Sequence, residues 1–244
     1  MFARLVIFST ASINFPCSLR ARLVERFRVL GAAARRTIPR LGSGGSPLVA
    51  LNLTKNRSRE YYVINAFVRS VKMKIFIASD IHGSEHYCKI MAEKYREESA
   101  DKLLLLGDLL YHGPRNDLPL VYNPRGVIAI LNSLKNEIIC VRGNCDTEVD
   151  QMVLDFPIMA EYAIIYDGNK TIYATHGHKF NPQNPPMLKS GDILLNGHTH
   201  IPANEAFGEF YYVNPGSVSI PKNGSNHSYM IYENGKFTLK NLCD

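Results

Sequence analysis

Aspartate, histidine and asparagine recur in five short, glycine-containing segments of this 244-residue chain. The segments are Asp80-Ile81-His82-Gly83, Gly107-Asp108, Gly143-Asn144-Cys145-Asp146, His176-Gly177-His178 and Gly197-His198-Thr199-His200. Carboxylate, amide and imidazole groups supply the oxygen and nitrogen ligands that divalent metals prefer. Glycine beside each of them lets the backbone turn sharply and come close to an ion or a phosphate. The pattern predicts a metal site, and two metals about 3.5–4 Å apart would suit in-line displacement at phosphorus.

Each of these residues also has a structural explanation when taken alone. Asp80 could cap the helix that follows it. Asp108 and Asn144 could be turn residues, and His176 and His198 could be hydrogen-bonded core histidines. The metal site is the better interpretation because all five segments occur together, each directly after a predicted strand.

Apolar runs that alternate with amphipathic ones predict the elements that carry these segments. We predict helices over residues 84–99 and 126–134. We predict strands over residues 74–79, 102–106, 138–142, 162–166, 171–175, 193–196, 209–213, 229–232 and 236–239, with hairpin turns at 167–169 and 233–235. The first three strands alternate with helices, which indicates parallel pairing, and the later hairpins suggest a second sheet. Because the carboxyl ends of parallel strands converge on a ligand crevice, the five segments should share one pocket.

Charge is divided unevenly along the chain, although the net charge is +6. Residues 1–72 hold 13 basic and 2 acidic residues, whereas residues 73–244 hold 15 basic and 20 acidic residues. Phosphate contacts dominate affinity for nucleic acids, so the acidic second part disfavours general nucleic-acid binding. No run approaches the roughly 18 apolar residues of a membrane span. Five cysteines without a Cys-x-x-Cys pair disfavour a disulfide scaffold and indicate a cytoplasmic protein.

Residues 1–72 form an Arg-rich, acid-poor extension that we expect to be disordered or non-native. An apolar stripe over 19–30 with arginines around it is also typical of an organellar transit peptide or a membrane-surface helix. Residues 42–47, Gly-Ser-Gly-Gly-Ser-Pro, indicate a flexible linker. Every chemical motif lies after Met73, so we expect no catalysis from this extension.

The order of the five polar segments resembles the signature of the calcineurin-like metallophosphoesterase superfamily. Three further segments, 112–116, 142–146 and 214–221, resemble its bacterial YfcE-type phosphodiesterases. The resemblance runs from Met73 to about Leu239. It implies a metallophosphoesterase domain over residues 73–244, with the α/β fold of that superfamily: a four-layer α/β/β/α sandwich of two mixed sheets.

The resemblance also implies a ligand set for two divalent metals. One metal would be bound by Asp80, His82 and His200, the other by Asn144, His176 and His198, with Asp108 bridging both. The usual metals are Mn²⁺, Fe, Zn²⁺ or Ni²⁺, and we favour Mn²⁺. A hydroxide shared by two cations forms near neutral pH and would attack phosphorus in line with the leaving oxygen. Asp108 and Asn144 would then serve catalysis as well as metal binding.

One departure from the superfamily pattern affects substrate preference. Many relatives carry Gly-Asn-His after the third strand, whereas this chain has Cys145, and a thiol is a weak hydrogen-bond donor. Cys145 is more plausible as a structural or substrate-contacting residue than as a nucleophile. His178 could replace the missing acid, and His112 and Arg115 are candidates for binding a phosphate oxygen.

We therefore predict a metal-dependent hydrolase of a small phosphodiester, in a protein that could form a homo-oligomer. The alternatives are a phosphomonoesterase with the same site and a non-catalytic interaction scaffold of the same fold. Localisation would be cytoplasmic, or organellar if residues 1–72 are a genuine transit peptide.

Overall fold

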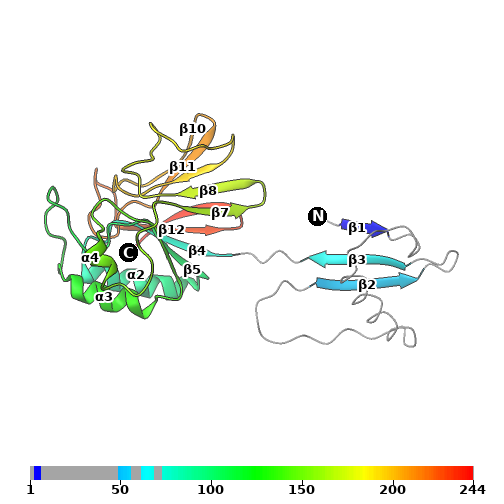
Figure 1. Ribbon diagram of the computed structural model, residues 1–244, viewed down its shortest axis with the longest axis horizontal. Coiled ribbons are helices and arrows are strands. Elements are labelled where there is room, and N and C mark those ends of the chain that lie inside the picture. The colour runs from blue at the N-terminus through cyan, green and yellow to red at the C-terminus, as the bar shows by residue number, and fades with distance from the viewer. Residues whose placement is uncertain (1–2, 7–48, 56–61, 69–72, 244) are drawn as a thin grey trace. The chain divides into compact units, whose positions relative to one another are not determined.

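The computed structural model describes residues 3–6, 49–55, 62–68 and 73–243 (Figure 1). The chain divides into two compact units, Met1–Val71 and Lys72–Asp244. Among the described residues, no helix has the length and apolar character needed to cross a membrane.

The first unit contains a three-stranded antiparallel sheet in the order β1-β3-β2. Its strands are β1 (Ala3–Val6), β2 (Val49–Lys55) and β3 (Tyr62–Val68). None of these strands was predicted from the sequence. The amphipathic run over 19–30 and the predicted linker over 42–47 lie outside the described residues.

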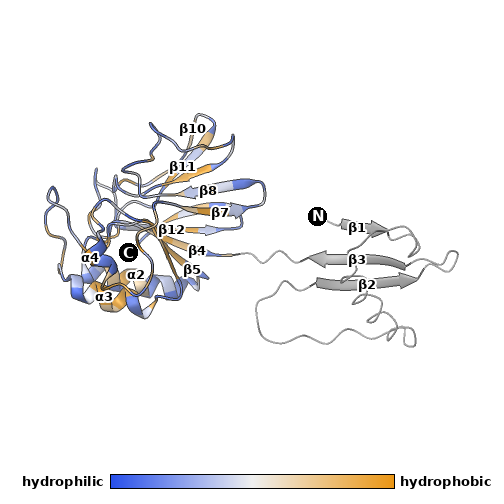
Figure 2. Cartoon of the chain, in the orientation of Figure 1, coloured by the Kyte–Doolittle hydropathy of each residue, from blue (hydrophilic) through white to orange (hydrophobic). Residues whose placement is uncertain are grey.

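The first sheet of the second unit has the order β13-β12-β4-β5-β6. Its strands are β4 (Ile75–Ala78), β5 (Lys102–Leu105), β6 (Ile138–Cys140), β12 (Ser228–Glu233) and β13 (Lys236–Asn241). The strands β4, β5 and β6 pair in parallel, as predicted, whereas β12 is antiparallel to both β4 and β13. β4 and β5 are hydrophobic almost throughout (Figure 2), as expected of strands covered on both faces.

Among the described residues, helices lie between the three parallel strands and directly after β6. In α2 (Glu85–Glu98) the Ser84 hydroxyl accepts the N–H of Tyr87 and caps the helix, so Asp80 is not its cap. Pro124 opens α3 (Pro124–Ser133), which begins two residues earlier than predicted. The single turn α4 (Glu148–Gln151) was not predicted.

The second sheet has the order β10-β11-β9-β8-β7. Its strands are β7 (Ala163–Asp167), β8 (Lys170–Ala174), β9 (Ile193–Leu195), β10 (Ala203–Phe207) and β11 (Phe210–Asn214). β9 is parallel to both β8 and β11. The predicted hairpin turns are confirmed between β7 and β8 and between β12 and β13, whereas β10 was missed.

Two apolar layers hold the second unit together. Phe76, Leu103 and Leu105 point from the first sheet toward α2 and α3. Alternate residues of the same strands, such as Ile77 and Leu104, face the second sheet. Because side chains alternate between the faces of a strand, each strand of the first sheet serves both layers. The predicted α/β sandwich of two mixed sheets is confirmed.

The outer face of the second sheet is covered by a loop over residues 177–192 rather than by a helix among the described residues. Phe180 of this loop packs edge-on against Tyr173 of β8, with ring centroids 5.9 Å apart. The loop contains Pro182, Pro185 and Pro186, which are incompatible with a helix interior. The loop therefore occupies the place of the fourth layer and begins in the segment His176-Gly177-His178.

Candidate metal centre

The seven predicted ligands come together where the carboxyl ends of both sheets meet. Four of them follow strands of the first sheet, and three follow β8 and β9 of the second sheet. The residues are Asp80, His82, Asp108, Asn144, His176, His198 and His200. Parallel strands in each sheet aim their following loops at the same edge, which explains why residues up to 120 positions apart become neighbours.

Asp80, His82 and His200 form the first half of the centre. The Nε2 atoms of His82 and His200 are 3.2 Å apart. They lie 3.7 Å and 3.3 Å, respectively, from Oδ1 of Asp80. All three side chains are at most 3% exposed. Three ligand atoms therefore surround one small, buried volume.

Asn144, His176 and His198 form the second half. Nε2 of His176 lies 3.0 Å from Oδ1 of Asn144 and 3.1 Å from Nδ1 of His198. His176 is buried, but Asn144 is exposed and His198 is half-buried. This half is open on one side.

Asp108 lies between the two halves. Its Oδ2 atom is 3.7 Å from Nε2 of His82 and 3.4 Å from Nε2 of His176. Its Oδ1 atom accepts the backbone N–H of Cys145 at 2.8 Å, which fixes the carboxylate plane. One oxygen of Asp108 therefore faces both halves.

Hydrogen bonds to the backbone set the tautomers of three histidines. The Nδ1 atoms of His82, His176 and His200 lie 2.8, 2.7 and 2.6 Å from carbonyl oxygens of residues 111, 106 and 220. A carbonyl only accepts, so each Nδ1 carries the proton and each neutral ring presents an Nε2 lone pair to the centre. The two lone pairs at 3.2 Å in the first half repel each other unless a cation lies between them.

Asp80 supplies an independent sign that the residues of the centre suit a cation. It is fully buried, and its Oδ1 atom has no hydrogen-bond partner among the described residues. Its Oδ2 atom accepts the backbone N–H of His198 at 3.0 Å, which ties the two halves together. A buried carboxylate oxygen without a donor is costly, and a metal ion would satisfy it. The residues present therefore fit a pair of divalent metals.

The charges in the centre are strongly coupled. Burial opposes ionisation of Asp80, but His200 and His82 outweigh it and hold the pKa of the carboxyl well below its ordinary range. Burial likewise opposes ionisation of Asp108, but His176 lowers its pKa. In the opposite sense, burial would lower the pKa of His176, but Asp108 and Asp80 raise it to about 9. Two carboxylates thus stay ionised in a site that attracts cations.

Backbone strain gathers at the same positions. Asp80, His82, Asp108, His198 and His200 all have φ between 49° and 67°, in the left-handed region that non-glycine residues rarely adopt. Strain of this kind persists only where the surrounding structure enforces it, and it is concentrated at functional sites. The loops after β4, β5 and β9 therefore hold the candidate ligand side chains in place at the expense of an unfavourable backbone conformation.

Gly143 and Asp146 allow the loops after β5 and β6 to lie close together. A Cβ atom on Gly143 would lie 2.1 Å from Oδ1 of Asp108, so only glycine fits there. The buried carboxylate of Asp146 accepts backbone N–H groups of Asp108, Leu109 and Gly143 at 2.7–2.9 Å. Asp146 therefore positions Asp108 without facing the metal ligands itself.

A cavity of about 370 Å³ opens over the centre, and Arg115, Asn116, Cys145, Thr199 and Lys222 contribute to its walls. Arg115 and Cys145 were predicted to contact substrate. Lys222, Asn116 and Thr199 were not predicted; Lys222 directly follows the segment 214–221 that carries part of the resemblance, which could have drawn attention to it.

The other predicted substrate and catalytic residues lie at the margin of this cavity. His112 does not line it, and its ring packs edge-on against Tyr111 and Tyr122. His178 lies beside the centre, with its ring centroid 5.4 Å from that of His176. Burial and Asp108 raise the pKa of the Cys145 thiol above its ordinary range, which disfavours a thiolate nucleophile.

Comparison with known proteins agrees with this geometry. The model of the calcineurin-like phosphoesterase superfamily domain matches residues 73–236. Phosphodiesterase YfcE of Escherichia coli (strain K12) is 46% identical over 172 residues, covering 70% of this chain and 94% of that protein. The probable metallophosphoesterase YsnB of Bacillus subtilis (strain 168) is 25% identical over 177 residues, covering 69% and 89%. A solved structure of the E. coli phosphoesterase YfcE matches with a TM-score of 0.69, 46% identity and coverage of 70% and 94%.

The chain belongs to the calcineurin-like phosphoesterase superfamily, a family of metal-dependent hydrolases.

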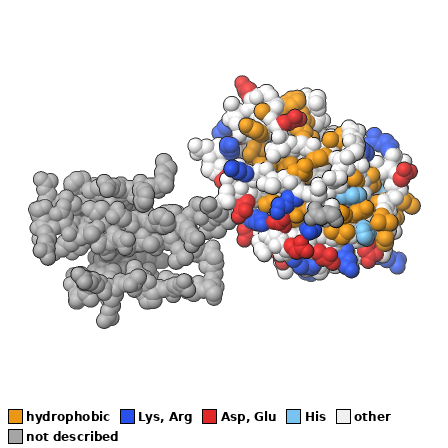
Figure 3. All heavy atoms as spheres, turned by 180° about the vertical axis from the view of Figure 1, so that it is seen from behind, with side chains coloured by type: hydrophobic (Ala, Val, Ile, Leu, Met, Phe, Trp, Pro, Cys, Tyr) orange, Lys and Arg blue, Asp and Glu red, His pale blue; other side chains and the backbone are white. Residues whose placement is uncertain are grey.

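On the face of the described unit shown in Figure 3, Lys and Arg side chains stand among Asp and Glu side chains rather than in a continuous basic stripe.

Proposed function

We propose that residues 73–244 hydrolyse small phosphodiesters with the help of two divalent metal ions. The observation that carries this proposal is the pair of ligand clusters that face the same Oδ2 atom of Asp108. Asp80, His82 and His200 would hold one ion, and Asn144, His176 and His198 the other, with Asp108 shared. We propose Mn²⁺ on the strength of the resemblance to YfcE-type phosphodiesterases, because oxygen and nitrogen ligands by themselves would equally suit Fe, Zn²⁺ or Ni²⁺.

The bound metals would neutralise charge on the phosphoryl group and activate water as the nucleophile. The chain's own residues have separate tasks. Arg115 and Lys222, the two cationic side chains on the cavity wall, would bind phosphate oxygens. Asn144 would orient the phosphoryl group from the exposed side of the centre.

His178 is proposed to assist the leaving group. Its Nδ1 atom has no hydrogen-bond partner among the described residues, and it lies next to His176 and His198. Burial and His176 lower its pKa, so the neutral ring would act through an N–H donor rather than as a cation. Cys145, half-buried on the cavity wall, is proposed as a substrate contact.

Diester specificity is supported by the relative that shares 46% identity with this chain and is named a phosphodiesterase. It is also supported by Cys145, which stands where an imidazole would otherwise help expel a poor leaving group. The cationic side chains of Arg115 and Lys222 would equally suit the two negative charges of a phosphomonoester, so phosphomonoester hydrolysis is the second candidate.

The test compares turnover of a p-nitrophenyl phosphodiester and of p-nitrophenyl phosphate by the full chain, with added Mn²⁺ and with chelator. We expect chelator-sensitive turnover of the diester and little turnover of the monoester. Preference for the monoester would favour the second candidate. Turnover of neither by a folded, metal-loaded protein would favour the non-catalytic scaffold.

Residues 1–72 are proposed to be dispensable for the reaction. The same assay on residues 73–244 tests this directly. Equal turnover by the full chain and the shorter protein is the expected result.

A further inference from the structure

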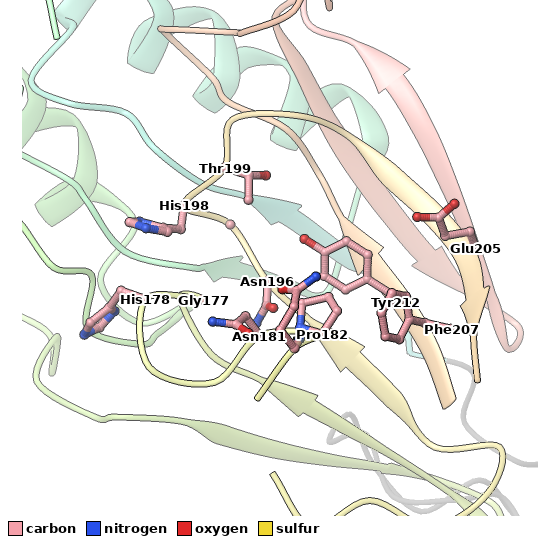
Figure 4. Close-up of a pocket in the computed structure, with 12 residues that line it drawn as sticks. Gly177, His178, Asn181, Pro182, Asn196, His198, Thr199, Glu205, Phe207 and Tyr212 are labelled. Atoms are coloured by element: carbon pink, nitrogen blue, oxygen red, sulfur yellow. Dashed lines mark hydrogen bonds between the residues drawn. The ribbon is translucent and has the colours of Figure 1, made fainter. Parts of the chain in front are cut away.

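A second cavity of about 320 Å³ lies next to the metal centre (Figure 4). His198 and Thr199 line both this cavity and the one that holds Arg115 and Lys222. The two spaces are therefore neighbours, separated by a residue that belongs to the centre itself. A phosphodiester has two ester groups, and a site with two adjoining spaces can distinguish them.

Besides the ligand segments that follow β8 and β9, two elements without predicted ligands contribute walls of the second cavity. On one side is the loop 177–192, with Asn181 and Pro182; on the other is the β10–β11 hairpin, with Phe207 and Tyr212 (Figure 4). Phe207 is 39% exposed although it is aromatic, and its ring tilts against Phe210 at 5.6 Å. An exposed aromatic ring beside a cavity offers a face for a planar group.

Asn196 provides a polar atom that the protein leaves without a partner. The residue is 1% exposed and lines the second cavity. Its Nδ2 atom donates to the carbonyls of Thr175 and Leu195, both at 3.2 Å, whereas its Oδ1 atom has no partner among the described residues. Buried acceptors are nearly always hydrogen-bonded in folded proteins. Oδ1 of Asn196 is thus an unpaired acceptor in the wall of the second cavity.

Charge separates the two cavities. The first contains Arg115 and Lys222 and suits a phosphate. Among its described lining residues, the second contains no lysine or arginine and instead contains Glu205. An additional phosphate or carboxylate would be repelled there.

We propose that the second cavity binds one ester group of the substrate, and that this group is an uncharged planar ring with a hydrogen-bond donor, as in a nucleobase. This inference rests on the proposed phosphodiesterase function. The phosphate would lie over the metal centre, and the ring would stack near Phe207 with its donor edge toward Asn196.

The experiment uses three diesters that share a trifluoroethyl leaving group, which is activated but not planar: the esters of adenosine 5′-phosphate, benzyl phosphate and methyl phosphate, with release of trifluoroethanol followed by fluorine NMR. For the unchanged full chain, kcat/KM should fall in the order adenosine, benzyl, methyl. The substitution Phe207→Ala should lower the adenosine-to-methyl ratio about tenfold, the typical value of one lost stacking contact. Phe207 is exposed on a hairpin, so this variant should fold.

A matched control is Tyr166→Ala, which removes an exposed aromatic residue from β7, at the opposite edge of the same sheet. Its adenosine-to-methyl ratio should match that of the unchanged protein. A second variant, Glu205→Lys, should raise the ratio of kcat/KM for a 4-carboxybenzyl diester to that for the benzyl diester about tenfold, because it reverses a charge.

Three results bear on the inference in different ways. Equal kcat/KM for adenosine and methyl diesters in the unchanged protein would overturn it while leaving the phosphodiesterase function intact. An unchanged ratio in Phe207→Ala would also overturn it. Turnover of none of the three diesters would instead overturn the phosphodiesterase function on which it rests.

Discussion

The two halves of the metal centre differ in their access to solvent. Asp80, His82 and His200 are enclosed between the sheets, whereas Asn144 and His198 reach the surface beside the two cavities. Both halves combine oxygen and imidazole groups that could bind a metal, and both face Oδ2 of Asp108. The first half combines the loop after the central strand β4 with His200, which follows β9. The second half combines Asn144, which follows the edge strand β6, with His176 after β8 and His198 after β9.

The difference indicates a division of labour. An enclosed ligand set is pre-organised by packing and exchanges its ion slowly, whereas an open set can share its ion with substrate. We therefore expect the first half to hold its metal more tightly and the second half to determine turnover. The following predictions test this division, beginning with the residue that both halves share.

Replacing Asp108 with Asn should have the largest effect. The substitution removes the bridging charge from both halves, so both ions should bind weakly and turnover should fall by more than about 100-fold, beyond the usual loss from an outer-sphere change. Metal analysis of the purified protein together with the diester assay checks this. A variant with full metal content and an unchanged rate would show that Asp108 does not bridge.

Removing one ligand from each half should give different results. Asn144→Ala should retain about one metal per chain, lose turnover about 10–100-fold and keep its thermal stability. His82→Ala should lose the enclosed metal and also lower the unfolding free energy by about 1–3 kcal/mol, because it leaves a buried void and an unpaired carbonyl at Tyr111. Thermal unfolding of the metal-free variants separates the two. Equal losses of stability would remove the distinction between the halves.

Replacing Asp146 with Asn tests how the shared ligand is positioned. The carboxylate accepts three backbone N–H groups, and an amide would turn a donor toward at least one of them. We expect metal affinity and kcat to fall about 10-fold with little change in KM, as for other outer-sphere partners of metal ligands. A change in KM alone would place Asp146 in substrate binding instead.

The smallest expected effect is a change in stability from a substitution of Glu98, at the opposite end of the first sheet from the centre. Partial burial opposes ionisation of Glu98, but hydrogen bonds from Lys240, Lys74 and Tyr229 outweigh it and lower its pKa to about 2. Because its pKa is lowered on folding, this stabilisation is present above about pH 4.5, the ordinary value for Glu, and is lost as the pH falls toward 2.

Glu98→Gln should therefore lower the unfolding free energy by about 1 kcal/mol at pH 7 and by much less near pH 2. Its metal content and turnover at pH 7 should equal those of the unchanged protein, because Glu98 lies far along the sheet from the centre. Unfolding curves at both pH values provide the measurement. Loss of metal in this variant would mean that the far end of the sheet also supports the site.

The sequence carried most of the information about the centre. Asp80, Asp108 and Asn144 follow apolar strands closely in the sequence. Their positions in the sequence therefore predict that they lie at the same edge of the sheet. Whether each residue binds metal stays a prediction, but their convergence follows from parallel pairing of β4, β5 and β6.

Features that depend on distant contacts were harder to predict. Strand β10 has the sequence Ala-Asn-Glu-Ala-Phe, which is weak in strand propensity and forms by pairing with β11. The turn α4 depends on the capping box between Thr147 and Asp150. The place of His112 away from the cavity, and of Lys222 on its wall, follows from loop packing that no local pattern encodes.

The left-handed backbone at five candidate ligands has a consequence for evolution of the family's chemistry. Because these conformations belong to the backbone of loops anchored between strands of the two sheets, the loops can keep their shape while individual ligands change. A lineage could then lose one ligand after another without losing the fold, and the surface would remain available for contacts with other proteins. Catalysts and binding scaffolds can in this way descend from a single, unchanging framework.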